Sequence, residues 1–143
     1  MSKLGTPTAA TSEAFLAEAG PRLADLCTAC GACFSACPMA AHIGLGEADA
    51  RAVTAGLALL ARGEAGPVET VTWAGACAKS GLCRDACPEQ GNGLDAMLLV
   101  RIARQKAITT TKQLGAKNDP TAFPRVKTFA RMQLTDEELE KWL

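Results

Sequence analysis

Apolar residues recur every three or four positions along much of the chain, and this spacing is typical of amphipathic helices. The first such segment is 12–26, with Ser12 suited to cap its start. Segments 46–62 and 93–108 show the same pattern, and Pro67 is suited to open a further short helix between them. No segment alternates as a strand does. The fold class predicted from the pattern is therefore mainly α.

The periodicity weakens beyond residue 108, where two prolines indicate an extended arm. Thr135 and Glu138 then form a capping box that opens a short helix bearing Trp142 near the end of the chain. We accordingly divide the chain into a helical domain over 1–108 and a basic arm over 109–143. The terminal helix is expected to fold back on the core or to dock on another protein, because it is too short to bury its apolar side chains alone.

Charge is distributed unevenly, although 15 basic and 15 acidic residues cancel. Residues 1–95 carry six basic and ten acidic side chains, 96–133 carry eight and one, and 134–143 carry one and four. This asymmetry predicts a cationic arm on a mildly acidic body. Nucleic acid is not expected as a partner, because the basic residues are dispersed singly and aromatic residues are few.

Bulky side chains are scarce, with four Phe, two Trp and no Tyr, so the core needs another source of cohesion. Seven cysteines are candidates for that role. The N-terminus has no leader pattern, and the longest apolar stretch, 52–61, is too short to span a membrane. We expect a soluble cytoplasmic protein, in which clustered cysteines bind metal more often than they form disulfides.

The first group of cysteines, Cys27, Cys30, Cys33 and Cys37, precedes Pro38 in the order C-x2-C-x2-C-x3-C-P. This is the ligand run of bacterial ferredoxins, in which three cysteines hold one cluster and the fourth reaches a second cluster. Short spacings wrap three thiolates around one cube of iron and sulfur, and the proline turns the chain away. The run therefore predicts two iron-sulfur clusters.

A second group repeats the end of the first as C-x5-C-x3-C-P, and Ser80 stands where Cys30 stood. By the crossing rule, a complete 4Fe-4S cluster takes one set of four thiolates, namely Cys27, Cys30, Cys33 and Cys87. The other cluster is left with three thiolates, namely Cys37, Cys77 and Cys83.

Three thiolates suit a 3Fe-4S cluster, or a 4Fe-4S cluster whose odd iron takes Ser80, water or an outside ligand. Serine would have to lose its proton to bind iron, so the competing interpretation is that Ser80 is a loop residue beside Gly81. Zinc prefers closed sets of four ligands, and the odd number of cysteines disfavours disulfides.

The two runs resemble the helical ferredoxin domain of succinate dehydrogenase and fumarate reductase iron-sulfur subunits, over about residues 15–108. The 39 residues between Cys37 and Cys77 leave room for two helices, as that fold requires. The 143 residues do not include the 2Fe-2S domain that precedes the helical domain in succinate dehydrogenase, so a role in succinate oxidation is not expected. Small free-standing helical ferredoxins of this size resemble instead the C subunit of heterodisulfide reductase, whose members usually keep all eight cysteines. The resemblance implies a helical ferredoxin with two cluster-binding loops.

In that family the clusters relay electrons between a flavoprotein and a B-type catalytic subunit. We therefore expect an electron-transfer subunit rather than an enzyme, because no other constellation of residues supports catalysis. His42, the single histidine, is expected in a turn or at the surface. Two alternatives remain: a substrate-binding open iron on the three-thiolate cluster, and a redox sensor.

Overall fold

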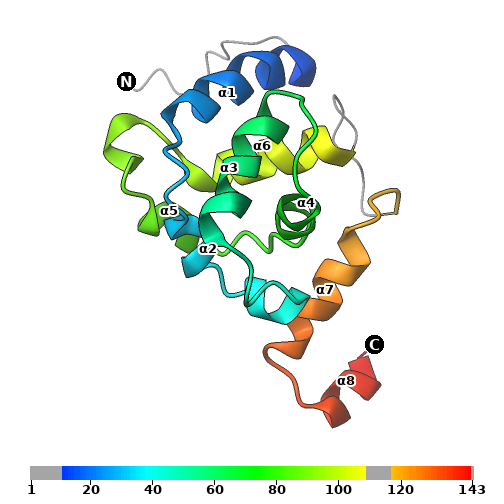
Figure 1. The fold of residues 1–143 in the computed structure, drawn as a ribbon. Coiled ribbons are helices and arrows are strands. Elements are labelled where there is room, and N and C mark those ends of the chain that lie inside the picture. Colours follow the sequence, from blue (N-terminus) through cyan, green and yellow to red (C-terminus); the bar gives the residue numbers. More distant parts are fainter. Residues whose placement is uncertain (1–10, 109–116, 143) are drawn as a thin grey trace, which may run out of the picture.

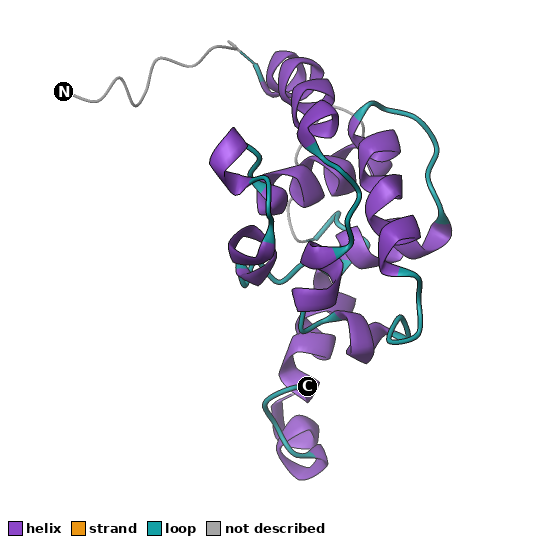
Figure 2. Ribbon diagram, turned by 60° about the vertical axis from the view of Figure 1, so that its left-hand side comes forward, coloured by secondary structure: helices purple, strands orange, loops and turns teal. Residues whose placement is uncertain are grey.

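The computed structural model describes residues 11–108 and 117–142. These residues form helices joined by loops and contain no strand (Figure 1, Figure 2). The helices in chain order are α1 (Ser12–Leu26), α2 (Ala32–Ala36), η1 (Ala40–Ile43), α3 (Ala50–Ala61), α4 (Val68–Gly75), α5 (Leu82–Ala86), η2 (Gln90–Asn92), α6 (Ala96–Ile108), α7 (Ala122–Arg131) and α8 (Asp136–Trp142). The mainly α prediction is confirmed. No helix in these ranges is both long and apolar enough to cross a membrane.

Side-chain caps decide where the long helices begin. Thr11, not Ser12, caps α1, because its backbone is extended and its side chain accepts a hydrogen bond from the Ala14 N–H at 3.1 Å. Asp49 caps α3 by accepting two N–H groups of the first turn, so this helix begins at Ala50 and not at residue 46. The helix predicted at 12–26 therefore has the expected bounds and a different cap, whereas α3 and α6 begin later than the predicted segments 46–62 and 93–108.

The core lies where α3 packs against α1 and α6, while α4 covers α3 and α6 from the side (Figure 1). Leu23, Leu57 and Leu99 contribute nearly fully buried side chains from three different helices. The rings of Phe34 and Trp73 meet edge to face with centroids 5.2 Å apart. With so few large side chains, the core depends on this contact between α2 and α4.

Small residues let the helices approach closely. A Cβ atom added at Gly56 of α3 would lie 2.2 Å from the Thr70 Oγ1 atom of α4. The Thr70 hydroxyl donates a hydrogen bond of 2.8 Å to the Val53 carbonyl oxygen in the same interface, and Thr70 is fully buried. The close crossing of α3 and α4 therefore requires glycine at position 56.

The prediction of an extended arm is wrong for residues 117–142, because α7 and α8 occupy much of this segment. Residues 109–116 of the predicted arm lie outside the described ranges. Pro124 lies in the first turn of α7, where its missing N–H costs no intrahelical hydrogen bond. The short terminal helix and its capping box are confirmed, since the Glu138 N–H donates to Thr135 Oγ1 and the Thr135 N–H to Glu138 Oε1. The domain boundary at residue 108 stays a prediction.

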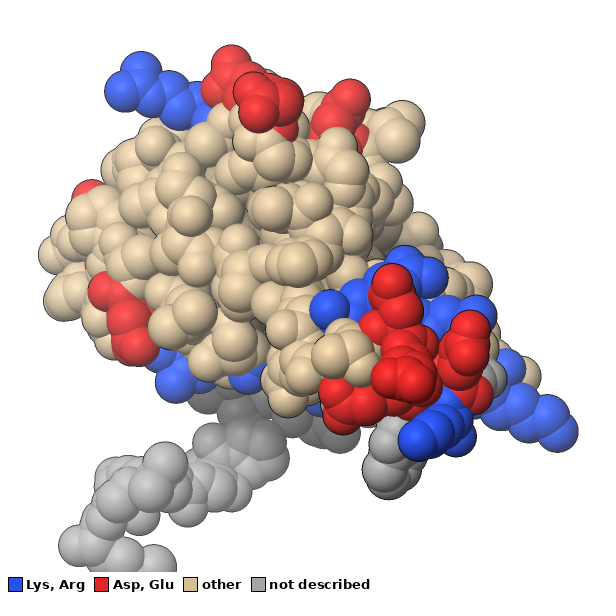
Figure 3. Space-filling view, turned by 90° about the horizontal axis from the view of Figure 1, so that it is seen from below, with Lys and Arg blue, Asp and Glu red and all other residues tan. Residues whose placement is uncertain are grey.

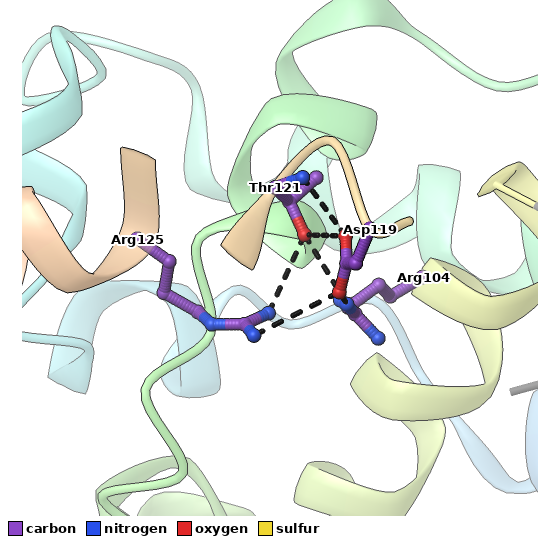
Figure 4. A network of polar contacts seen from close by, with 4 residues as sticks. All are labelled: Arg104, Asp119, Thr121 and Arg125. Carbon is purple, nitrogen blue, oxygen red and sulfur yellow. Dashed lines mark hydrogen bonds and ion pairs between the residues drawn. The ribbon is translucent and has the colours of Figure 1, made fainter. Parts of the chain in front are cut away.

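A buried polar network attaches the start of α7 to α6 (Figure 4). Asp119 forms an ion pair with Arg104 of α6 and accepts hydrogen bonds from the Thr121 N–H at 2.8 Å and hydroxyl at 2.7 Å. The Nη2 atom of Arg125 lies 3.8 Å from the Oδ2 atom of Asp119. Burial alone would raise the pKa of Asp119, but the Thr121 hydrogen bonds and the two guanidinium groups outweigh burial and lower it.

Candidate iron-sulfur sites

The two cysteine runs fold into the same local structure, with an offset of 50 positions from Gly31 to Gly81. Both glycines have left-handed backbones, with φ of +86° and +79°, and each leads into a five-residue helix, α2 or α5. The corresponding residues Ala29 and Lys79 also have positive φ, at 54° and 63°. The repeat in the sequence is thus a repeat in the backbone, and its two helices, α2 and α5, pack against each other.

The left-handed residues orient backbone N–H groups within the loops. A left-handed conformation costs a non-glycine residue about 1 kcal/mol or more, so the surrounding loop must hold it in place. In the first loop the Ala29 N–H donates to Cys27 Sγ at 3.4 Å. Hydrogen bonds to cluster sulfurs are one of the levers by which a protein sets a cluster's reduction potential.

The first of two cavities between the helices is lined by the four cysteines that the crossing rule predicts as one set: Cys27, Cys30, Cys33 and Cys87. Its empty volume is about 360 Å³. Leu57, Leu94 and Leu99 supply an apolar wall, and Glu89 also lines the cavity. The structure therefore brings Cys87 of the second run to the three cysteines of the first.

The second cavity has the same empty volume, about 360 Å³, and is lined by the other predicted set, Cys37, Cys77 and Cys83, together with Ser80. Sequence reasoning missed its remaining wall, in which Met39, Trp73 and Met97 lie beside the thiols. The chain has only two tryptophans, and this rarity was the one feature of the sequence that could have drawn attention to Trp73. The exchange of Cys37 and Cys87 between the cavities matches the ligand pattern of two-cluster ferredoxins.

Ser80 lines the second cavity from an exposed position at the start of α5. Its hydroxyl accepts a hydrogen bond from the Leu82 N–H at 3.4 Å, a local contact typical of serine in turns. This contact favours the interpretation of Ser80 as a loop residue. Ser80 nevertheless belongs to the wall of the cavity that the three cysteines line.

Burial makes several of the cysteine thiols weak acids. It raises the pKa of Cys33 to about 12 and that of Cys83 to about 11, and neighbouring cysteines raise both further. The pKa of Cys27 is also raised, chiefly by burial. At neutral pH these thiols are protonated unless a positive charge stabilises the thiolate, which is what bound iron supplies. The donor set and the mainly apolar walls thus fit an iron-sulfur cluster in each cavity.

No group of three or more His, Cys, Asp or Glu side chains in the described part of the chain is arranged to hold a metal ion. The ligands of a cubane cluster each bind a different iron and stand farther apart, so this finding concerns mononuclear sites. His42 lies on η1 with an exposed side chain and lines neither cavity, which confirms its predicted place at the surface.

Comparison with known proteins agrees with this geometry. Residues 23–91, just under half of the chain, match the family model of the 4Fe-4S dicluster domain, and the match includes all seven cysteines. Searches of the curated proteins and of the solved structures gave no match. Together, the helical fold and the family match support the identification of the chain as a ferredoxin-like iron-sulfur protein with a role in electron transfer.

Proposed function

We propose that this chain is the electron-transfer subunit of a heterodisulfide reductase-like complex, in which it relays single electrons between a flavoprotein and a B-type catalytic subunit. One observation carries the proposal: each cavity combines cysteines of one run with the cysteine before the proline of the other. When bound, an iron-sulfur cluster supplies a centre that gains or loses one electron. Two such centres on one small scaffold suit a relay.

The roles of the chain's own residues follow from this arrangement. Cys27, Cys30, Cys33 and Cys87 hold the first, complete 4Fe-4S cluster. Cys37, Cys77 and Cys83 hold the second, of the 3Fe-4S type or an incomplete 4Fe-4S type. The contact of α2 with α5 keeps the two sets together, and the leucine and methionine side chains of the walls limit the access of water.

Partners and compartment belong to the same proposal. The flavoprotein and the B-type subunit come from the resemblance in the cysteine runs, and the cytoplasmic location stays a prediction from the sequence. The resemblance does not extend to Ser80, which replaces the cysteine that relatives of the C subunit usually keep. The type of the second cluster is therefore the part of the proposal that needs the most direct test.

Iron and sulfide quantitation with EPR spectroscopy on anaerobically purified protein tests the proposal. We expect seven or eight irons per chain, and an EPR signal in the oxidised protein if the second cluster is of the 3Fe-4S type. A folded preparation without iron would contradict the proposal entirely. A 4Fe-4S signal that shifts when a thiol or disulfide ligand is added would instead indicate an open, substrate-binding iron.

The Ser80→Cys variant examines the second site directly. It restores a fourth thiol to the wall of the second cavity, so we expect eight irons per chain and loss of any 3Fe-4S signal. Ser35→Cys is the matched control, because Ser35 is exposed on α2 and lines neither cavity. An identical spectroscopic change in both variants would show that Ser80 does not face the cluster.

A further inference from the structure

The internal repeat allows the two cavities to be compared position by position, and two matched positions differ in charge. With the offset of 50, Lys79 in the wall of the second cavity corresponds to Ala29 in the wall of the first. Glu89 in the wall of the first cavity likewise corresponds to Met39 in the wall of the second. Neither charged residue lines the other cavity. The second cavity therefore has a positive charge where the first has none, and the first has a negative charge where the second has none.

No neighbouring charge cancels these two. Lys79 is exposed and forms no ion pair with another described residue. The carboxylate of Glu89 accepts a hydrogen bond of 2.5 Å from the side-chain amide of Asn92, which is uncharged. Arg84 of the second cysteine run is different, because it pairs with Asp95 at 3.3 Å and lines neither cavity. Among the described residues that line the cavities, Lys79 and Glu89 are thus the charged side chains without a counter-charge.

Each of these charges changes the readiness of its cavity to hold an added electron. The electron makes a bound iron-sulfur cluster more negative, so a nearby ammonium group favours reduction and a nearby carboxylate opposes it. The mainly apolar walls strengthen both effects, because they exclude the water that would screen the charges. Lys79 therefore favours an electron in the second cavity, and Glu89 disfavours one in the first.

Backbone hydrogen bonds do not cancel this difference. Equivalent bonds reach Cys33 and Cys83, in each case from the residue that follows. The bond from the Ala29 N–H to Cys27 Sγ belongs to the first loop and favours an electron there. An N–H group carries only a partial charge, whereas the two side chains carry whole charges of opposite sign. The side-chain charges should therefore decide which cavity is easier to reduce.

We propose that Lys79 and Glu89 set the direction of electron transfer within the chain, by giving the second site the higher reduction potential. This inference rests on the proposed function and adds a direction to it. One electron leaves the first site, which is oxidised, and enters the second site, which is reduced, so the step needs no further reactant. Cys83 of the second set raises the pKa of Cys33 of the first, because the contact of α2 with α5 brings the two sets close together.

Redox titration of the iron-loaded protein, followed by EPR at low ionic strength, tests this inference. Lys79→Ala removes the positive charge and restores the residue that the first loop carries at the same left-handed position. At a fixed solution potential, the reduced-to-oxidised ratio of one cluster should fall about three- to tenfold. Glu89→Gln removes the negative charge and keeps the size of the side chain. It should raise the ratio of the other cluster by a similar factor.

A reciprocal variant and two controls complete the experiment. Ala29→Lys places a positive charge in the first loop, so it should shift the same cluster as Glu89→Gln does, and in the same direction. Glu137→Gln and Lys141→Ala change the net charge equally but lie on α8, where acidic side chains gather away from both cavities (Figure 3). These two controls should leave both ratios unchanged.

The order of the potentials gives the decisive outcome. In the unmodified protein, the cluster that responds to Lys79→Ala should have the higher potential, and the reverse order would overturn the proposal. Shifts of one and the same cluster by Lys79→Ala and Glu89→Gln, or shifts no larger than those of the controls, would also overturn it. Iron content separates the two proposals: unchanged potentials in iron-loaded variants refute only the role of these charges, whereas folded protein without iron refutes the proposed function itself.

Discussion

Replacing Asp119 by alanine is expected to release α7 from α6 while the remaining helices stay folded. The Asp119 side chain is 4% exposed and neutralises Arg104, whose own side chain is 18% exposed. The Nε atom of Arg104 is buried and has no hydrogen-bond partner among the described residues, so this guanidinium depends on the carboxylate. Removal of Asp119 would leave a nearly buried positive charge without its counter-charge.

The size of the effect follows from that burial. Breaking a buried ion pair from one side costs about 3–5 kcal/mol, and the partial exposure of Arg104 places this case near about 3 kcal/mol. Since about 1.4 kcal/mol corresponds to a factor of ten, the population of molecules with α7 released should rise roughly 100-fold. The loss should be local, because the Leu57 and Leu99 contacts of the core do not involve this network.

Hydrogen exchange followed by mass spectrometry measures this population. Exchange of the α7 amides should accelerate in Asp119→Ala, while the amides of α3 keep their protection. Asp25→Ala is the matched control, because Asp25 pairs with Arg62 but its side chain is 72% exposed, and such surface pairs contribute at most about 1 kcal/mol. An equal effect of Asp25→Ala on its own helix, or opening of α3 together with α7, would contradict this prediction.

The same network predicts a pH dependence. Because the pKa of Asp119 is lowered in the folded protein, its contribution to stability is fully present above the pKa in the unfolded chain, about 3.9. The contribution is lost as the pH falls through the lower pKa of the folded state. The difference in α7 exchange between the unmodified protein and Asp119→Ala should therefore be smaller at pH 3 than at pH 5.

Two further perturbations concern the core and the cysteines. Gly56→Ala should lower the free energy of unfolding by about 1–3 kcal/mol, because the new Cβ would lie 2.2 Å from Thr70 Oγ1. Thermal melts measure this loss, and Gly91→Ala is the control, because the space around position 91 is open. After a chelator has removed the iron, Cys33 should react more slowly with an alkylating reagent than any other cysteine, because burial raises the pKa of Cys33 to about 12 and keeps its thiol neutral. Faster alkylation of Cys33 than of the exposed Cys30 would contradict this expectation.

Much of the candidate site could be predicted from the sequence because cluster ligands are encoded locally. Spacings of two and three residues place successive thiolates around one cluster, and the proline after the last cysteine sends it to the other. This local rule assigned Cys37 and Cys87 to the cavities in which the structure places them. The amphipathic segments likewise predicted α1, α3 and α6, whereas α2 and α5 have five residues each and are too short to show a period.

The tertiary structure alone decided which side chains from distant segments surround those cysteines. Met39, Trp73 and Met97 meet in one cavity wall through helix packing, and no spacing in the sequence links them. Asp119 likewise finds Arg104 across 15 positions. The placement of α7 beside Ala78 depends on such contacts. Local spacing therefore determined the ligand sets, because a chain can wrap a cluster only over short distances, whereas the cavity walls depended on how whole helices pack.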